Sequence, residues 1–395
     1  MISLQEARRL ITDHIPPRAP RRLPLAEAHG LILAEDVTAD AAYPDGDRSQ
    51  MDGYVVRADA VPGLFRCVGE IPAGAVPSQP LEPGTCARIF TGAMLPPCGG
   101  RVVIQEDAAV EKDGIKLPVF SERMFVRQKG CEALPGHVIL RAGSLLGAVE
   151  LAMLAQVGAV FPLVIPPPTV RHLATGGELV DPSKKPGPGR IRDTNSSLLR
   201  ALLTADGITD LNSGRIADDP EAMLLAADGN ADLLLISGGA GAGDFDFGAV
   251  TLRRLGWTIH FDRVNLRPGK PLTFATRGNR AAFVIPGNPV SHFVCYHTAL
   301  RLAVELAAGR PPSWPALWVD LQDAATLQPD ARETWWPATA FVREGRLLVQ
   351  PKPWSSSGNT FALAGTNALV QVNTQSPRDG QALTLLLTPP ATVPS

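Results

Sequence analysis

The hydrophobic positions at the start of the chain recur with the spacing of an α-helix. Leu4, Ala7 and Ile11 fall on one helical face, and a second helical stretch is predicted up to residue 37. A further amphipathic helix is predicted over residues 148–157. If this helix packs on the first one, residues 1–37 and 137–167 form a single N-terminal domain from two chain segments.

Between residues 38 and 136 the pattern changes to short apolar runs separated by proline and glycine. The runs read LFRCVGEI, ARIFTGAML, RVVIQEDAAV and GIKLPVF. Short apolar runs bounded by turn residues are typical of β-strands. The segment therefore predicts a small β domain, and the prolines of IPPPTV predict a stiff linker further along the chain.

From residue 168 to 311, strand-like and helix-like patterns alternate. The strand TVRHLAT precedes the helical stretches SSLLRALLTADG and DPEAMLLAADG, and the strand ADLLLI follows them. This alternation predicts a three-layer α/β domain with a mostly parallel sheet. Residues 312–395 contain short strands and turns, which predict a C-terminal β-barrel-like domain. The fold class is therefore multidomain, α/β and β.

Composition narrows the classes of protein that fit this pattern. The chain has 395 residues and a net charge of −2. Nucleic-acid-binding proteins need an excess of basic residues, which this chain lacks, so that class of protein is not expected. Its five cysteines form no CxxC pair and no cluster with histidine, so no zinc site or disulfide framework is expected. No signal peptide is recognised, and no apolar run reaches the roughly 20 residues of a membrane span. The expectation is a cytoplasmic protein with reduced thiols.

The most informative local pattern is a buried strand that opens into a glycine-rich loop. Residues 231–246 read ADLLLISGGAGAGDFD. Successive glycines let backbone N–H groups converge on an anion. Asp244 and Asp246 would repel a bare phosphate, so they indicate a bridging divalent cation. The spacing fits neither a dinucleotide fingerprint nor a Walker A loop, and a plain tight turn is an equally good interpretation of the loop alone.

Two further loops favour a binding site over a plain tight turn. Arg267 and Lys270 lie on the Pro-Gly turn of NLRPGKP, and the strand of AFVIPGNPVS ends in Pro286, Gly287, Asn288 and Pro289. In an open α/β sheet, the loops after parallel strands gather on one edge, where ligands bind. The three loops therefore predict a site for an anionic, metal-associated ligand. Taken alone, the two cations are better explained as solvated surface charge.

These loops and several other segments resemble one known family. SGGAGAGDFD, RPGKP and IPGNPVS resemble signature loops of molybdopterin molybdenumtransferase, the family that includes the C-terminal domain of gephyrin. SQMDGYVVRADAV, VGEIPAG and RIFTGAMLP are similar to the family's earlier blocks, and LATGGEL and RIRDTN are similar to its α/β segments. The matches occur in order over nearly the whole chain.

The resemblance implies a four-domain, elongated homodimer in molybdenum cofactor biosynthesis. Its implied reaction takes adenylylated molybdopterin and molybdate as substrates, requires Mg²⁺, releases AMP and leaves molybdenum on the dithiolene. The implied protein partners are molybdoenzymes or other cofactor-biosynthesis proteins. The chemistry agrees with the loops, because a tetrahedral dianion needs N–H donors and cations, and a phosphoanhydride needs a metal held by carboxylates.

Carried over by position, the resemblance assigns roles to individual residues. The implied magnesium ligands are Asp246, Glu178 and Asp219, which with Asp52 are the implied catalytic residues. Helix capping competes as an explanation for Asp219, as it does for Asp244, and a surface charge competes for Glu178. Asp52 and Thr91 are expected to face the α/β domain of the partner subunit. The implied substrate-binding residues are Thr91, Gly238, Gly239, Gly243, Arg267, Lys270, Pro286, Asn288, Pro289 and Ser357.

The sequence also departs from the family pattern around the expected cleft. Glycine replaces an aspartate at Gly100 and Gly177, and replaces a serine at Gly241. Arg267 replaces a lysine, Cys131–Glu132 replaces Glu-Asp, and Pro337 replaces an arginine. These changes threaten turnover more than ligand binding. A non-catalytic carrier of molybdopterin or finished cofactor is therefore the alternative to an active enzyme, and a protein-interaction scaffold is the least favoured interpretation.

Overall fold

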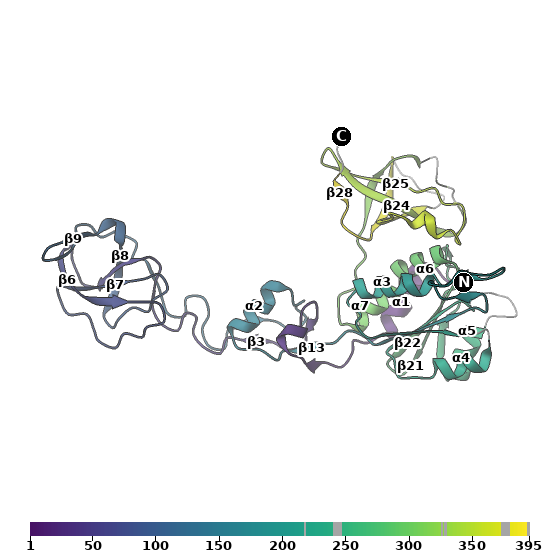
Figure 1. Ribbon diagram of the computed structural model, residues 1–395, viewed down its shortest axis with the longest axis horizontal. Coiled ribbons are helices and arrows are strands. Elements are labelled where there is room, and N and C mark those ends of the chain that lie inside the picture. The colour runs from purple at the N-terminus through teal and green to yellow at the C-terminus, as the bar shows by residue number, and fades with distance from the viewer. Residues whose placement is uncertain (217–218, 240–246, 325–326, 328–329, 373–379, 393–395) are drawn as a thin grey trace. The chain divides into compact units, whose positions relative to one another are not determined.

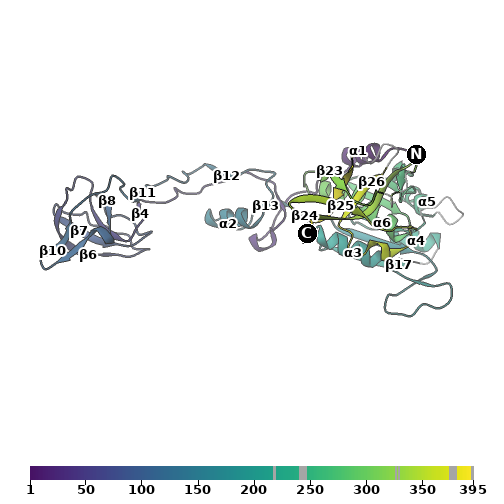
Figure 2. The same ribbon diagram turned by 90° about the horizontal axis from the view of Figure 1, so that it is seen from above.

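The computed structural model describes residues 1–395 except 217–218, 240–246, 325–326, 328–329, 373–379 and 393–395. The chain divides into two compact units, which Figures 1 and 2 show as ribbons. The first unit consists of Met1–Arg22, Gly30–Ala34 and Leu163–Ser395, and the second of Leu23–His29 and Glu35–Pro162. Domain boundaries within these units remain a prediction. Among the described residues, no helix has the length and apolar character needed to cross a membrane.

The first unit is built on a six-stranded sheet. Four neighbouring strands run parallel. Two further strands complete one edge, where each pairs antiparallel with its neighbour. In spatial order the strands are β17 (Leu211–Ile216), β14 (Val170–Thr175), β18 (Leu233–Ser237), β22 (Arg280–Ile285), β21 (Thr273–Arg277) and β19 (Thr258–Phe261). Every residue of β18 is buried, because helices cover both faces of the sheet. A strand that is buried on both faces is apolar along its length, as the run Leu233–Ile236 is. The predicted mostly parallel sheet is confirmed.

Alternate residues of the central strands enter two separate hydrophobic cores. Leu233 and Leu235 pack with the helices α1 (Leu4–His14), α3 (Asn195–Ala205), α6 (Pro289–Cys295) and α7 (Arg301–Ala307). Leu234 and Ile236 pack on the other face with α4 (Pro220–Ala227) and α5 (Phe247–Arg254). A π-helical turn, η3 (Tyr296–Leu300), joins α6 to α7. Figure 1 shows α4 and α5 on the opposite side of the sheet from α3, α6 and α7, which makes three layers.

The N-terminal segment differs from its prediction after the first helix. Beyond α1 the structure has the short elements β1 (Arg21–Arg22), η1 (Leu25–Glu27), β2 (Ile32–Leu33) and β3 (Val37–Thr38) rather than a second helix. The prolines between residues 16 and 24 lack the N–H donors that a helix needs. The buried face of α1 packs against α7 and η3, and the predicted helix is present as α2 (Ala148–Gln156); that the two helices pack together stays a prediction. The strand β13 (Leu163–Ile165) pairs with both β1 and β2.

The second unit contains the predicted small β fold. Its main sheet has six strands, β8 (Gly99–Ile104), β5 (Gly53–Arg57), β7 (Thr85–Ile89), β6 (Gly63–Ile71), β10 (Gly114–Leu117) and β9 (Ala109–Glu111), in that order. The 3-10 turn η2 (Gln105–Asp107) follows β8. Two short pairs complete the unit: β4 (Arg48–Ser49) with β11 (Val126–Arg127), and β3 with β12 (Val138–Leu140). Helix α2 packs against η1.

The C-terminal part of the first unit closes into a five-stranded barrel, as the sequence predicted. Its strands are β24 (Glu333–Arg343), β25 (Arg346–Pro351), β23 (Ala316–Leu321), β27 (Gln381–Leu386) and β26 (Ala368–Val372), and β26 pairs back onto β24. Trp336 and Val349 lie in its core. The short strands β20 (Leu266–Arg267) and β28 (Ala391–Thr392) also pair with β24.

Candidate active site

The loops that follow β14, β18 and β22 meet at one edge of the central sheet. The N–H of Gly238, just after β18, donates to the carbonyl of Ile285 at the end of β22, at 2.9 Å. Gly238 has φ 91°, and a Cβ there would lie 2.6 Å from the Thr175 hydroxyl oxygen. Only glycine fits where the loop after β18 passes this close to Thr175 at the end of β14. Gly239 also has a positive φ, of 60°. Gly241, Gly243, Asp244 and Asp246 lie outside the described residues.

The loop that contains Arg267 and Lys270 lies at the same edge of the sheet, but next to a different kind of strand from the one predicted. The sequence suggested that Arg267 and Lys270 follow a parallel strand, but they precede β21, which is antiparallel to β22. Thr273, the first residue of β21, pairs with Val284 near the end of β22. The start of an antiparallel strand lies beside the end of its neighbour, so the three loops still converge.

Two cavities open at this edge and share part of their walls. The larger has a volume of about 1080 Å³ and the smaller one of about 990 Å³. Glu178, Asn195, Gly238 and Gly239 line the larger cavity, whereas Arg267 and Lys270 line the smaller. Pro271, Pro286, Asn288 and Asn359 line both. Both cavities therefore present cations, because Arg190 and Arg192 also line the larger one, and the larger one adds the side-chain oxygens of Glu178 and Asn195.

The two predicted carboxylates in the described region occupy different positions. Glu178 is exposed and lines the larger cavity. Asp219 is the N-cap of α4, where its Oδ1 accepts the N–H of Glu221 at 2.8 Å and that of Ala222 at 3.1 Å. It does not line the larger cavity among the described residues. The capping role weighed from the sequence is therefore present, and no group of three or more acidic, histidine or cysteine ligands occurs in the described part of the chain.

Asn195 is a residue of the larger cavity that the sequence interpretation did not single out. Its Nδ2 donates to the carbonyl of Gly287 at 2.6 Å, while its Oδ1 is buried without a hydrogen-bond partner among the described residues. A buried amide oxygen without a donor is costly unless a ligand or a cation meets it. Its position in RIRDTN, directly at the start of α3, is the signal that could have pointed to it.

Arg267 and Lys270 differ in whether their charge already has a partner within the protein. The Arg267 guanidinium lies 3.3 Å from Asp330 and 5.5 Å from the ring centroid of Trp354. Hydrogen bonds from Arg332, together with the charge of Arg267, lower the pKa of Asp330 to about 2. Lys270 is exposed, and among the described residues no hydrogen bond or ion pair of its ammonium is found. Lys270 is thus the cation available for a ligand.

Ser357 brings the C-terminal part of the chain to the cavities. Its hydroxyl accepts a hydrogen bond from Asn288 Nδ2 at 2.9 Å, and its carbonyl accepts the Val290 N–H at 3.0 Å. Ser357 lines the smaller cavity together with Lys270. The sequence expectation that Ser357 and Asn288 lie at one cleft therefore agrees with their direct contact.

In the second unit, Asp52 and Thr91 form a pair of their own. One carboxylate oxygen of Asp52 accepts both the N–H and the hydroxyl of Thr91, at 2.7 Å each. These hydrogen bonds hold the pKa of Asp52 below its usual value, so the carboxylate is ionised at neutral pH. Both residues are exposed. A hydrogen-bonded, ionised and exposed carboxylate is available to another molecule or subunit.

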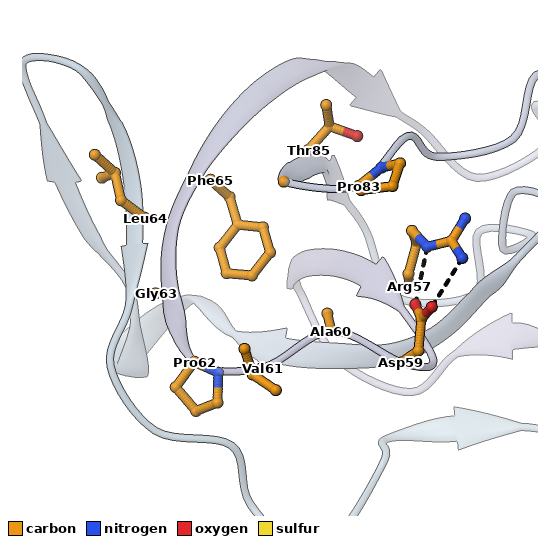
Figure 3. Close-up of a pocket in the computed structure, with 11 residues that line it drawn as sticks. Arg57, Asp59, Ala60, Val61, Pro62, Gly63, Leu64, Phe65, Pro83 and Thr85 are labelled. Atoms are coloured by element: carbon orange, nitrogen blue, oxygen red, sulfur yellow. Dashed lines mark hydrogen bonds and ion pairs between the residues drawn. The ribbon is translucent and has the colours of Figure 1, made fainter.

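The second unit also has a cavity of about 340 Å³ that the sequence did not predict. Figure 3 shows Arg57 and Asp59 facing each other at its wall, with Val61, Pro62 and Phe65 nearby. The guanidinium binds both carboxylate oxygens of Asp59, at 2.8 and 2.9 Å. The two charges satisfy each other, and Asp52 and Thr91 do not line this cavity among the described residues.

Comparison with known proteins identifies the family of this chain. Residues 2–158 match the model described as MoeA N-terminal region (domain I and II), and residues 171–305 match the probable molybdopterin binding domain. A molybdopterin molybdenumtransferase from Nostoc sp. is 36% identical over 358 residues, covering 87% of this chain and 82% of that protein. The chain belongs to the molybdopterin molybdenumtransferase family.

Other relatives and solved structures agree with that assignment. The molybdopterin molybdenumtransferase of Bacillus subtilis is 32% identical and covers 90% of this chain and 87% of its own length. Two structures of the molybdopterin biosynthesis MoeA protein from Pyrococcus horikoshii have TM-scores of 0.80 and 0.76 at 25% identity. Both alignments cover 98% of this chain and the whole of the solved chains. The chain is accordingly a transferase of molybdenum cofactor biosynthesis.

The departures from the molybdopterin molybdenumtransferase pattern have different structural settings. A Cβ on Gly100 would lie 2.4 Å from the Cβ and 2.7 Å from the Cα of Ala58, so the backbone leaves no room for an aspartate. Gly177 is exposed, and its carbonyl accepts a hydrogen bond from Arg190. Pro337 is buried in β24. Glu132, beside Cys131, pairs with Arg127 at 3.1 Å.

Beneath the glycine-rich loop of this molybdopterin molybdenumtransferase family member lies a buried polar chain. The Ser237 hydroxyl lies 2.7 Å from Nε2 of His172 and 2.7 Å from Nε2 of His292. A hydroxyl has one proton to donate, so one imidazole accepts it and the other donates to the oxygen. Burial lowers the pKa of His172 to about 4 and that of His292 to about 3, so both rings are neutral. The chain connects β14, the end of β18 and α6.

Proposed function

We propose that this chain transfers molybdenum from molybdate to adenylylated molybdopterin, with release of AMP. The observation that carries the proposal is the pair of cavities that share the wall of Pro286 and Asn288. The smaller cavity offers the cations Arg267 and Lys270, and the larger one offers oxygen ligands beside two arginines. A reaction between a tetrahedral dianion and a phosphoanhydride needs both environments next to each other.

In this proposal, Lys270 and Arg267 attract molybdate into the smaller cavity. Gly239, which lines the larger cavity, offers its N–H to the phosphates of the pterin nucleotide, whereas the N–H of Gly238 already donates to Ile285. Water attacks the bond between the two phosphates, so AMP leaves and the pterin keeps its own phosphate. The two dithiolene sulfurs replace oxygen atoms of molybdate, which leave as water, and the oxidation state of molybdenum does not change. Asn288 lies at the shared wall, where it donates a hydrogen bond to Ser357.

The described residues fit a magnesium ion that is bridged by substrate. Glu178 supplies a carboxylate and Asn195 supplies a buried amide oxygen without a partner, and Mg²⁺ prefers such oxygen ligands with waters and substrate phosphates. Asp246 and Asp219 are the further ligands that we propose from the family resemblance. When bound, the ion would stabilise negative charge that develops on the phosphate oxygens.

We further propose that the active form is a homodimer. The family resemblance assigns Asp52 and Thr91 to the same reaction as Glu178, although they belong to the second unit. The ionised, exposed Asp52 supports a role toward a site on a partner subunit.

A carrier that binds molybdopterin without turnover is the second candidate. The tight packing at Gly100 supports it, because the aspartate of the family pattern has no space there. The enzyme releases AMP and forms molybdenum-loaded pterin, whereas a carrier does neither, so AMP release distinguishes the two.

The deciding experiment incubates the purified protein with adenylylated molybdopterin, Mg²⁺ and molybdate, and measures AMP release. The enzyme proposal expects AMP and molybdenum-loaded pterin in equal amounts. Asp246→Asn should slow AMP release by about 10²- to 10³-fold while retaining pterin binding, since a metal-held charge acts mainly in the transition state. Tight pterin binding by the unmodified protein without AMP would leave the carrier function.

A further inference from the structure

The C-terminal part of the chain places one aromatic ring at the larger cavity. Phe361 lies in the 3-10 turn η5 (Thr360–Leu363) and lines that cavity with Gly358, Asn359 and Thr360. Its side chain is 91% exposed, the highest value among the exposed large apolar residues that the structure describes. It is also the one aromatic side chain among the described residues that line this cavity.

The exposure of Phe361 is imposed by a well-anchored turn. Leu363 of the same turn packs against the main hydrophobic core, and η5 contacts α6. The Ala362 N–H donates to the carbonyl of Asn359 at 3.2 Å, and the Ala364 N–H donates to that of Phe361 at 3.2 Å. The turn therefore holds the Phe361 backbone in place while Leu363, and not Phe361, supplies the contact with the core.

An exposed phenyl ring beside a polar cavity favours a particular kind of ligand. Phenylalanine has no hydrogen-bonding group, so it recognises the flat face of a ring by stacking and by removal of apolar surface from water. The rest of this cavity wall presents Glu178, Arg190, Asn195 and backbone groups, which suit phosphates and polar ring edges. A ligand that combines a planar heteroaromatic ring with phosphate satisfies both parts of the wall.

We infer that Phe361 is a specificity-determining residue that stacks on a planar heteroaromatic ring of the substrate. The inference rests on the proposed function, whose substrate carries two such rings, a pterin and an adenine. Both rings offer the same flat, π-rich face, so the structure identifies the shared chemistry, and separate binding measurements distinguish the two sources.

The test measures the affinity of AMP and of molybdopterin separately, by equilibrium dialysis, for the full-length protein and its variants. Stacking on an aromatic side chain contributes about 1–3 kcal/mol, which converts to a loss of about 5- to 150-fold in affinity. Phe361→Ala should show this loss for one of the two probes and leave the other unchanged. Phe361→Tyr should restore the affinity, and Phe361→Leu should restore less of it, because leucine is apolar but not planar.

Leu225→Ala provides the matched control, because Leu225 is 80% exposed and does not line this cavity. The thermal midpoint of Phe361→Ala should equal that of the unmodified protein, which separates lost stacking from lost folding. Unchanged affinity of Phe361→Ala for both probes, with normal AMP release, overturns this inference and leaves the proposed function standing. An unmodified protein that binds neither probe and releases no AMP overturns both.

Discussion

At the scale of single residues, Lys270 is the cleanest probe of the proposed anion site. Its ammonium is exposed, so Lys270→Ala removes a ligand contact without leaving another charge unpaired. A charge-assisted hydrogen bond contributes about 1.5–3 kcal/mol, so molybdate should bind about 10- to 150-fold more weakly. Titration calorimetry with molybdate measures this directly.

The control for that experiment is Lys112→Ala, an exposed lysine in the turn between β9 and β10 of the second unit. It should keep the affinity of the unmodified protein. Arg267→Ala is less informative, because it also removes the Arg267–Asp330 ion pair and leaves Asp330 with Arg332 alone among the described residues. Equal molybdate affinity in Lys270→Ala and the unmodified protein would move the anion site elsewhere.

Gly100 gives a second prediction at this scale. Gly100→Asp introduces a Cβ only 2.4 Å from that of Ala58, and the neighbouring Ala58 Cα belongs to the backbone. Overpacking of this kind should lower the free energy of unfolding by about 1–3 kcal/mol. Gly229→Asp is the matched control, since an added Cβ there meets nothing within 4 Å. Thermal unfolding of the two variants checks the prediction, and equal midpoints would contradict it.

The predictability of single site residues depends on how local their signals are. Asp219 precedes Pro220 and Glu221, and this spacing alone predicts the N-cap that the structure contains. The meeting of Ser357 with Asn288 came from the family resemblance, because 69 residues separate them. Asn195 and Phe361 were missed, because only the folded cavity shows that one oxygen lacks a donor and one ring lacks cover.

At the scale of elements, the strand beside Arg267 and Lys270 was the part of the site that the sequence interpretation placed wrongly, because β21 follows them and is antiparallel to β22. An apolar run has the same pattern in either direction, and connection length does not determine which neighbour the strand joins. The strands β14, β18 and β22 were predictable because each is an apolar run bounded by turn residues and helical patterns. The prediction of a second N-terminal helix was wrong, because it relied on the spacing of apolar residues and gave too little weight to the prolines between them.

The buried histidines predict a pH dependence of stability. In the folded protein, burial lowers the pKa of His172 to about 4 and the pKa values of His292 and His297 to about 3. The unfolded chain takes up protons near pH 6.5, while the folded chain does not. Stability should therefore fall as the pH falls below about 6.5, by about 1.4 kcal/mol per pH unit for each histidine, until the folded-state pKa values are reached.

Urea unfolding at several pH values between 8 and 5 tests this prediction. All six tryptophans lie in the first unit, which also contains the three histidines, so tryptophan fluorescence reports on the relevant unit. Most carboxylates titrate below this range, which leaves the histidines as the main source of the slope. A flat stability between pH 6.5 and 5 would show that the rings are protonated or exposed in the folded state.

At the scale of the whole molecule, the proposed homodimer predicts complementation between two inactive variants. Asp52→Asn alters the second unit and Glu178→Gln alters the first. If each site combines the second unit of one subunit with the first unit of the other, a heterodimer of the two variants contains one intact site. Such heterodimers, isolated with two different tags, should show about half of the AMP release of the unmodified dimer.

Homodimers of each variant are the controls and should be inactive. An inactive heterodimer would show that both residues act within one chain, and a fully active monomer in sedimentation experiments would exclude the shared site. The sequence supplied this prediction through family resemblance alone, because apolar patterning within one chain carries no record of which surface meets a second copy.

The packing of α1 against α7 has a consequence for synthesis on the ribosome. Arg8 donates a hydrogen bond to the carbonyl of Thr298, 290 residues further along the chain. At translation rates of about 5–20 residues per second, roughly 15 to 60 s pass before that partner emerges. Throughout this interval the face formed by Leu4, Ala7 and Ile11 lacks its contact with α7, whereas the second unit, which ends at Pro162, is already translated in full. The first helix to be translated thus receives its complete set of packing partners only late in synthesis.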